Sequence, residues 1–301
     1  MGQAHGLRLE HAIFHGPREV LLEWSEVDTP KHYADWPGGD ELGAKLRVWT
    51  VQRGEFPNDW DVGLVSDPYG FEDSPDCEWI SSGINSKGPT AMALGRQANL
   101  FLWGFAGDPT HLTESGKAVF VNTLVYMRPF AGAPKLVPAS ERATVLPARE
   151  WALVYARYAR RKVAAPELAE WLESRFPESA RAACGLDAAK LEAYYQEHLE
   201  FLRPAGERGF AVDPDLVELG VGNRSKAFLG KLVLRWKAAP GDPLCQRLAS
   251  RYVAAGPFAD AASLERWIAE AGERLFFSDC GGFQWRVAPV RKSPPTPAPT
   301  R

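Results

Sequence analysis

The sequence predicts an α/β domain followed by a mostly α-helical domain that ends in a β-hairpin. The first part of the chain contains short runs of β-formers separated by Gly, Pro and Asp. A proline-rich stretch without periodicity follows, and beyond it apolar residues recur at the spacing of amphipathic helices. We therefore expect the α/β domain over 1–130, a linker over 131–147, the helical domain over 148–290, and a disordered proline-rich tail over 291–301.

The α/β domain is expected to contain five strands and one helix. Three strands rich in β-formers are expected at 19–22, 46–52 and 62–65. Two more, at 90–96 and 100–105, are expected to form a hairpin that turns at 97–99. Thr113 precedes a run whose apolar residues keep near-helical spacing, so it is expected to cap a helix over 114–127.

Six helices are expected in the second domain, because apolar faces recur there at intervals of three and four residues. These faces span residues 151–158, 168–172, 191–202, 229–236, 244–252 and 264–271. Asp242 and Pro243 suit the N-cap and first turn of the fifth helix, and Gly272 suits the end of the sixth. The last apolar segment is expected to be a hairpin that turns near Gly281 and Gly282.

Composition and charge exclude several classes of protein. The chain is 45% hydrophobic and 24% charged, which is typical of a globular protein. Its net charge of -3 argues against a nucleic-acid partner, which usually meets a strongly basic face. No run approaches 18 apolar residues, so no membrane span is expected, and the first residues lack the features of a signal peptide. We expect a cytoplasmic protein, or an exported one if this chain is a piece of a longer protein.

Cysteine, histidine and acidic residues form no clear metal-binding pattern. The four cysteines lack C-x-x-C spacing, so free thiols are expected. His11 and His15 are four residues apart, but the Gly16-Pro17 step argues against the helix that would bring them together. The acidic run 72–78 lacks the EF-hand spacing, so a solvated loop is favoured over a Ca²⁺ or Mg²⁺ site. We therefore expect no metal and no cofactor.

The sequence identifies no catalytic residue. Cys77 lies within the acidic run, whose carboxylates are expected to raise the pKa of its thiol and so to disfavour a nucleophile. The glycine-flanked serine or cysteine of a nucleophile elbow is absent from the sequence. His198 lies on an apolar helix face, which favours a buried structural histidine.

The segment SSGINSKGP, residues 81–89, is the strongest candidate for a binding loop. A phosphate loop requires Gly-Lys followed by Ser or Thr at the start of a helix, whereas this lysine precedes Gly-Pro and a predicted strand. The proline also lacks an N–H donor. Two interpretations stay open. The loop lines the rim of a sugar or anion site through Ser82, Asn85 and Lys87, or it is a polar turn whose side chains cap their own backbone.

Three more polar residues complete the predicted ligand-binding set. Arg96 lies in the strand after the loop, within reach of the same site. His111 lies in the loop before the predicted helix, and loops after strand ends carry ligands in α/β sheets. Asp67 is expected to join Lys87 and His111 as a polar group of a site between the domains.

The segment DCEWISSGINSKGPTAMALGRQANLFLWGFAGDPTHLTESGKAVFVNTLVYM resembles the C-terminal part of trehalose-utilisation-type (ThuA-like) domains. It is similar to segments of large, uncharacterised bacterial proteins typical of planctomycetes. HAIFHGP, which starts at His11, resembles their His-Pro-Ile-Phe-x-Gly-Pro, with Ala12 in place of proline. The resemblance covers residues 11–290 and implies a partial or reduced class I glutamine amidotransferase-like sheet domain followed by helices.

Two departures from that family bear on activity. A full amidotransferase-like domain has a nucleophile-elbow half before the position of His11, where this sequence has ten residues. Glutamine amidotransferases also use a Cys–His–Glu triad, whereas the last long strand here leads into WGFAGDP, with Phe105 where a histidine is needed and no His-x-Glu. The resemblance therefore does not imply glutaminase activity, and a fold alone does not assign a function.

We expect a non-catalytic or weakly catalytic module that binds a carbohydrate or another small polar ligand. One alternative is an enzyme of carbohydrate metabolism whose site lies between the domains. The other is an interaction scaffold whose helical domain binds a protein partner. Convergent polar groups with perturbed pKa values would favour the enzyme, and a broad apolar patch would favour the scaffold.

Overall fold

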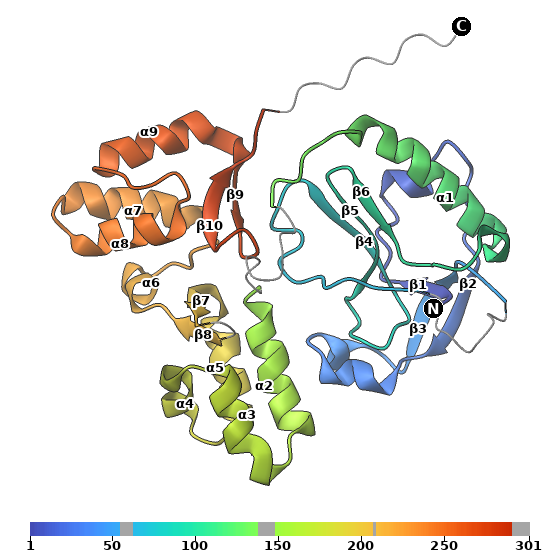
Figure 1. Ribbon diagram of the computed structural model, residues 1–301, viewed down its shortest axis with the longest axis horizontal. Coiled ribbons are helices and arrows are strands. Elements are labelled where there is room, and N and C mark those ends of the chain that lie inside the picture. The colour runs from blue at the N-terminus through green and yellow to red at the C-terminus, as the bar shows by residue number, and fades with distance from the viewer. Residues whose placement is uncertain (55–62, 138–147, 207–208, 291–301) are drawn as a thin grey trace, which may run out of the picture.

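A six-stranded sheet forms the first part of the chain in the computed structural model, which describes residues 1–54, 63–137, 148–206 and 209–290. Its strands are β1 (Gln3–His5), β2 (Trp24–Asp28), β3 (Lys45–Thr50), β4 (Cys77–Gly83), β5 (Met92–Gln97) and β6 (Leu100–Trp103). Their order is β2-β3-β1-β4-β5-β6, and each neighbouring pair is antiparallel. Helices follow the sheet and a hairpin comes last, which confirms the predicted mixed α/β character (Figure 1).

Helix α1 (Glu114–Met127) covers one face of the sheet (Figure 1). Its bounds are the predicted ones, and the Thr113 hydroxyl accepts the capping hydrogen bond from the backbone N–H of Gly116 at 3.0 Å. Val119 from the helix belongs to one apolar core with Trp49 and Leu94 from the strands. The Trp49 indole N–H donates to the Ser115 hydroxyl at 2.9 Å, so even this large ring keeps its polar atom paired.

Two short 3-10 helices, η2 (Lys31–Asp35) and η3 (Gly39–Glu41), accompany the opposite face. Side chains alternate along a strand, so Leu46 and Val48 point away from the α1 side that Trp49 occupies. These two residues form a second, smaller core with the fully buried Tyr33. The sheet is thus covered on both faces.

The sequence pattern misplaces part of this sheet. The prediction of a strand over 19–22 is wrong, since Leu21 is 76% exposed and β2 begins only at Trp24. The pattern does not predict β1 or β4. β1 has only three residues and pairs on both sides with strands that are distant in the sequence, so no local pattern indicates it. β4 ends in consecutive buried residues and has register shifts between Trp79 and Ser82, so it lacks the alternation of a regular strand. Residues 63–65 form no strand, and residue 62 lies outside the described residues.

Eight helices and two hairpins make up the described part of the second domain. The helices are α2 (Glu150–Lys162), α3 (Leu168–Arg175), α4 (Glu178–Cys184), α5 (Ala188–His198), α6 (Pro214–Leu219), α7 (Lys226–Ala238), α8 (Pro243–Tyr252) and α9 (Ala261–Ala271). The hairpins pair β7 (Leu202–Ala205) with β8 (Gly209–Val212), and β9 (Leu275–Ser278) with β10 (Gln284–Val287). The pattern predicts six of these helices and the final hairpin, but not α4, α6 or the β7–β8 hairpin.

Helix ends in this domain follow the predicted side-chain chemistry. Asp242 caps α8 by accepting from Leu244 N at 2.9 Å, and Pro243 is its first residue. Gly272 ends α9 with a φ of +55°, a conformation that favours glycine. The domain has its own large core around buried aromatic rings, among them Trp236 and Trp285. Of the predicted linker, residues 138–147 lie outside the described residues, as does the predicted tail.

A buried ion pair joins the start of the helical domain to its last hairpin. Arg149, just before α2, and Asp279, in the β9–β10 turn, are 0% and 1% exposed. Asp279 accepts hydrogen bonds from Arg149 Nε at 2.9 Å and Nη2 at 2.7 Å, and from Arg149 N at 2.9 Å. On its other side, Asp279 N donates to the Asp73 carboxylate of the sheet domain at 3.1 Å. The β9–β10 turn therefore connects both domains.

The substitution Arg149→Met is expected to destabilise the protein by about 3–5 kcal/mol, because it leaves the Asp279 carboxylate buried without its cation. Urea denaturation at equilibrium measures this loss. The control Arg161→Met breaks an exposed pair with Asp40 and is expected to cost no more than about 1 kcal/mol. Equal effects of the two substitutions would contradict the role given to the buried pair.

Candidate functional site

The surface where α2 meets the sheet domain brings aromatic and acidic side chains together. From the sheet domain come the end of η2, the segment before β4 and the loop between β4 and β5. From the helical domain come α2 and the β9–β10 turn. We call this surface the interdomain seam and define it by Trp36, Asp67, Tyr69, Asp73, Lys87, Trp151, Tyr155 and Cys280.

Trp151 is the centre of the aromatic part of the interdomain seam. Its ring centroid lies 6.3 Å from that of Trp36 and 5.8 Å from that of Tyr69, with the rings edge-on across the domain boundary. Tyr155, one turn along α2, lies 5.4 Å away. Edge-to-face pairs contribute about 1 kcal/mol each beyond the area they bury. The four rings are each half-buried, so they hold the domains together and still present ring surface to solvent.

Asp67 lies at the rim of this aromatic group. Its carboxylate accepts from Trp151 Nε1 at 2.7 Å and from Tyr69 N at 2.9 Å. The desolvation of the carboxylate among these rings raises its pKa above the ordinary value, although both hydrogen bonds and the charge of Lys87 act in the opposite direction. Lys87 itself is exposed, and its ammonium donates to Val65 O at 3.4 Å. The predicted Asp67 and Lys87 are therefore near each other.

A second carboxyl of the interdomain seam is strongly perturbed. Burial and the neighbouring charge of Asp279 raise the pKa of Asp73 from 3.8 to about 6. Cys280 follows Asp279, and its thiol donates to Tyr69 O at 3.9 Å. Burial and the same two carboxylates raise the pKa of the Cys280 thiol to about 12, so it stays protonated and is a poor nucleophile.

Beyond the aromatic rings, three basic residues of α2 make polar contacts with the sheet domain. Arg157 donates to the backbone oxygen of Trp36 at 2.7 Å. Arg161 pairs with Asp40 at 2.7 Å, and Lys162 pairs with an aspartate of η2 at 2.9 Å. Exposed pairs of this kind contribute little stability each, but together they fix how α2 lies against η2 and η3.

Ser82 and Asn85 make hydrogen bonds within the loop and the sheet. The Ser82 hydroxyl donates to Ala91 O at 2.6 Å. The Asn85 side chain donates to Gly83 O at 2.6 Å and accepts from Lys87 N at 2.6 Å. Both residues are buried, and Asn85 has the geometry of the polar turn whose side chain caps its own backbone. Of the loop residues in the predicted set, Lys87 is the exposed one.

Arg96 lies in a different cluster, at the end of the sheet near the last turn of α1. Its Nε donates to Glu78 Oε2 at 2.7 Å, and Tyr126 OH donates to the same oxygen at 2.7 Å. His11 Nε2 lies 3.4 Å from that oxygen, and its Nδ1 accepts from Ile13 N. Although burial acts to raise it, these contacts hold the pKa of Glu78 below its ordinary value. His11 thus contacts Glu78 through Nε2 and the backbone of Ile13 through Nδ1, which favours a structural network.

His111 lies elsewhere again. Its Nδ1 is 3.1 Å from the backbone oxygen of Arg53, beyond the end of β3. Its prediction rests on the rule that ligands lie beside the carboxyl ends of parallel strands. Neighbouring strands of this sheet are antiparallel, so their carboxyl ends point in opposite directions in alternation. They do not gather at one end of the sheet, and the rule therefore does not apply to His111.

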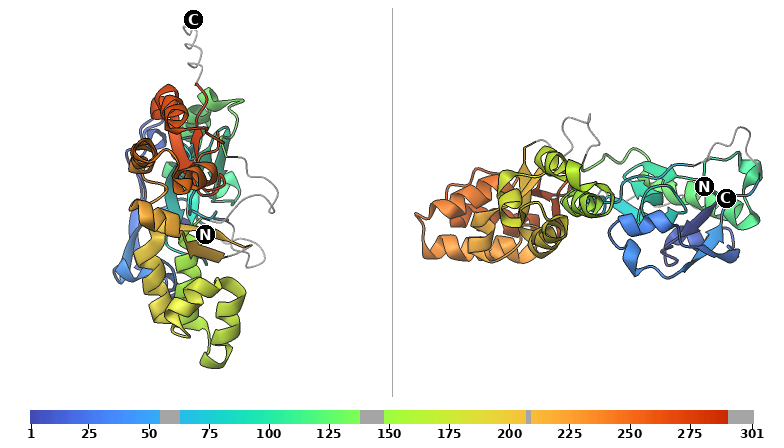
Figure 2. Two further views of the ribbon diagram at one scale, coloured as in Figure 1. Left: turned by 90° about the vertical axis from the view of Figure 1, so that its left-hand side faces the viewer. Right: turned by 90° about the horizontal axis from the view of Figure 1, so that it is seen from below.

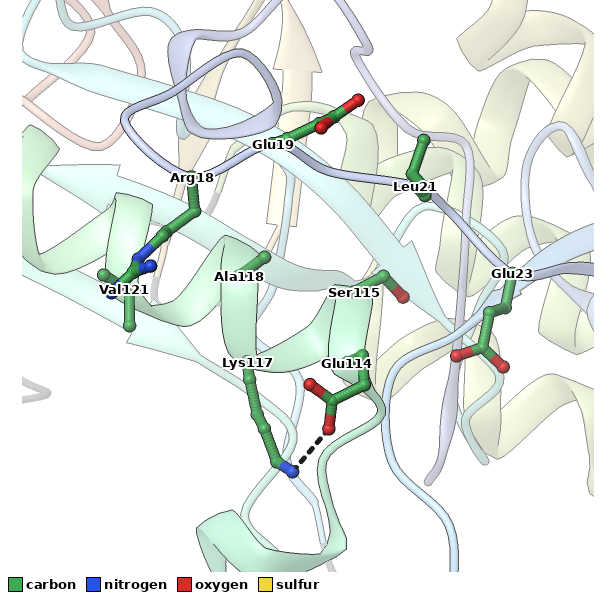
Figure 3. Close-up of a pocket in the computed structure, with 9 residues that line it drawn as sticks. All are labelled: Arg18, Glu19, Leu21, Glu23, Glu114, Ser115, Lys117, Ala118 and Val121. Carbon is green, nitrogen blue, oxygen red and sulfur yellow. Dashed lines mark hydrogen bonds and ion pairs between the residues drawn. The ribbon is translucent and has the colours of Figure 1, made fainter.

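Two cavities lie away from the interdomain seam, one in each domain. The first, of about 690 Å³, is an open groove between α1 and the segment that leads into β2 (Figure 3). The second, of about 370 Å³, lies between the end of α3 and the β7–β8 hairpin, where it is lined by Arg175 and Phe176.

The described residues contain no group of three or more His, Cys, Asp or Glu side chains that could hold a metal ion. Among the same residues, no helix is long and apolar enough to cross a membrane. Burial, followed by the charge of Asp76, raises the pKa of the Cys77 thiol, which confirms the predicted direction.

The sequence patterns place Trp151 and Tyr155 on a core-facing helix face and do not predict their role in the interdomain seam. The density of aromatic residues around position 151 is the signal that points to it.

No family, no curated protein and no solved structure matches the chain. The resemblance to ThuA-like domains, and the amidotransferase-like fold that it implies, therefore stay predictions.

The raised pKa of Asp73 predicts how the stability of the folded protein changes with pH. Because folding raises this pKa from 3.8 to about 6, the folded state loses stability as pH rises from about 4 to about 6, and the penalty is constant above pH 7. Asp73→Asn keeps an acceptor for Asp279 N and removes the charge. Its stability relative to the unsubstituted protein is expected to rise by roughly 2 kcal/mol between pH 4.5 and pH 7, measured by urea denaturation. Parallel pH profiles of the two proteins would rule out a raised pKa at this position.

Proposed function

We propose that the protein binds a carbohydrate, or a small polar ligand of similar chemistry, at the interdomain seam, without strong catalysis. The observation that carries this proposal is the group of half-exposed rings around Trp151, with the Asp67 carboxylate and the Lys87 ammonium at its rim. Ligand sites favour domain interfaces and combine aromatic surface with a few polar groups.

The chemistry of a sugar matches these two kinds of group. A sugar ring presents C–H faces, which pack against aromatic rings, and hydroxyls, which both donate and accept hydrogen bonds. The Asp67 carboxylate can accept a hydrogen bond from a sugar hydroxyl, and the Lys87 ammonium can donate one to a hydroxyl oxygen. The resemblance of the sequence to trehalose-utilisation-type domains supports the same ligand class, and we propose a partial or reduced domain of that family.

An enzyme of carbohydrate metabolism is the second candidate. It is favoured by Asp67 and Asp73, two carboxyls with raised pKa values in the same interdomain seam. Hydrolysis of aryl glycosides by the purified protein, abolished in Asp73→Asn, would select this alternative. Binding without turnover would select the binding module.

A thermal-shift screen of the purified chain against sugars and sugar phosphates tests the proposed binding. Ligands that bind only the folded state raise Tm by mass action. A sugar that raises Tm is then titrated by calorimetry against variants. Asp67→Asn and Lys87→Ala are each expected to weaken binding about tenfold, which corresponds to the loss of one charge-assisted hydrogen bond.

The matched control is the Asp28–Lys45 pair on β2 and β3, which is also exposed, with a distance of 2.6 Å. Asp28→Asn and Lys45→Ala are expected to leave the affinity unchanged. The proposal fails if every sugar leaves Tm unchanged, or if the Asp67 and Lys87 variants bind as well as the controls.

A further inference from the structure

Helix α1 buries polar residues beside apolar ones and leaves several apolar residues exposed. Its buried face contains Ser115, Asn122 and Thr123, each less than 5% exposed. Asn122 donates to Ile13 O at 3.0 Å and to the backbone oxygen of Arg18 at 2.9 Å, so polar groups fix this face to the loop before β2. A surface helix normally buries its apolar residues and exposes its polar ones.

Three apolar residues of α1 lie on its outer face, while Val119 belongs to the core of the sheet domain. Val121 is 38% exposed, Leu124 is 58% exposed and Val125 is 41% exposed. Leu21, which is 76% exposed, lies across the groove from the same helix (Figure 3). Contiguous exposed apolar surface of this kind is typical of an interaction site.

The spacing of the outer face suits a second helix. Glu114, Lys117, Val121, Leu124 and Arg128 are all exposed, and the intervals between them are three and four residues in alternation. Arg128 follows the last residue of α1 with helical backbone angles, so it continues the same face. This alternation is the spacing of the positions along which two helices pack in coiled coils and bundles. Val121 and Leu124 are its apolar members here, and its outer positions are charged.

Charge along the stripe selects the occupant. An acidic residue, Glu114, stands at one end and a basic residue, Arg128, at the other, with Val121 midway between them. An antiparallel copy of α1, related by a two-fold axis at Val121, places Glu114 opposite Arg128 of the second copy at both ends. Leu124 then faces the small Ala118 of the second copy. A self-complementary surface of this kind is what a two-fold dimer requires.

The position of α1 leaves room for such a copy. In Figures 1 and 2 the helix lies on the outside of the sheet domain, at the end of the molecule away from the helical domain. The ion pair of Glu114 with Lys117, at 2.7 Å, is exposed and contributes little, so Glu114 can exchange it for Arg128 of the second copy.

We propose that two copies of this chain form a dimer by packing their α1 helices antiparallel around Val121. One helix and its neighbouring loop are at the small end of protein interfaces, so the expected dissociation constant is micromolar. The proposal does not depend on the proposed ligand site, which lies on a different surface.

Sedimentation equilibrium of the full chain from about 5 to 500 μM tests the dimer. Leu124→Glu is expected to weaken dimerisation at least tenfold, because it places a carboxylate in the centre of the apolar contact. The matched control is Leu234→Glu on α7, where the leucine is 69% exposed. The control is expected to dimerise like the unsubstituted chain. A chain that stays monomeric over this range, or equal effects of the two substitutions, overturns the proposal and leaves α1 to a different partner.

A charge exchange tests the orientation. Glu114→Arg and Arg128→Glu are each expected to weaken the dimer severalfold, since each puts like charges opposite one another. The double variant restores the opposite charges at both ends and is expected to recover the original affinity within about threefold. A parallel pair of helices, or a dimer through another surface, would show no such recovery. Thermal unfolding of each variant checks that the fold is retained.

Discussion

The bidentate pair of Arg149 and Asp279 is the contact on which the arrangement of both domains depends. A guanidinium and a carboxylate are costly to bury, and the cost is offset here because the hydrogen bonds between them are nearly complete. Arg149 also donates to Leu199 O at 3.2 Å, which ties the end of α5 to the same point. The backbone of Asp279 faces Asp73 of the sheet domain. One buried pair therefore orders the start of α2, the last hairpin and the approach of the two domains.

The candidate site follows from this order. Trp151 lies two residues after Arg149, so fixing the arginine fixes where the first turn of α2 presents its ring. The ring meets Trp36 and Tyr69 from the other domain, and its indole N–H holds Asp67. The raised pKa values of the carboxyls nearby arise from the same burial. Structure and electrostatics at the interdomain seam thus have a common origin.

Local chemistry was enough to predict some elements, and distant contacts determine the others. The capping hydroxyl of Thr113 and the Asp242-Pro243 step set helix starts within a few residues of sequence, so α1 and α8 could be predicted. The site could be predicted only in part. Asp67 and Lys87 do lie together, but the rings beside them come from helix positions whose spacing indicates a core face. The sequence predicts Arg96 within reach of the loop site. Instead, the pairing of β4 with β5 brings Arg96 to Glu78, eighteen positions earlier, which accepts its hydrogen bond.

The central place of β1 has a consequence for how the chain folds. Ala4 pairs with Trp49 on one side and with Gly83 on the other. β1 is synthesised before the rest of the sheet, so it stays unpaired until both neighbouring strands have been synthesised. Pairings between such distant segments are slow to form, and an unpaired strand is prone to associate with other chains in the meantime. The half of the sheet that contains β4, β5 and β6 is built from adjacent segments and can assemble first. We expect β1 to pair after this half has formed, because its two partners, β3 and β4, lie far from it in the sequence.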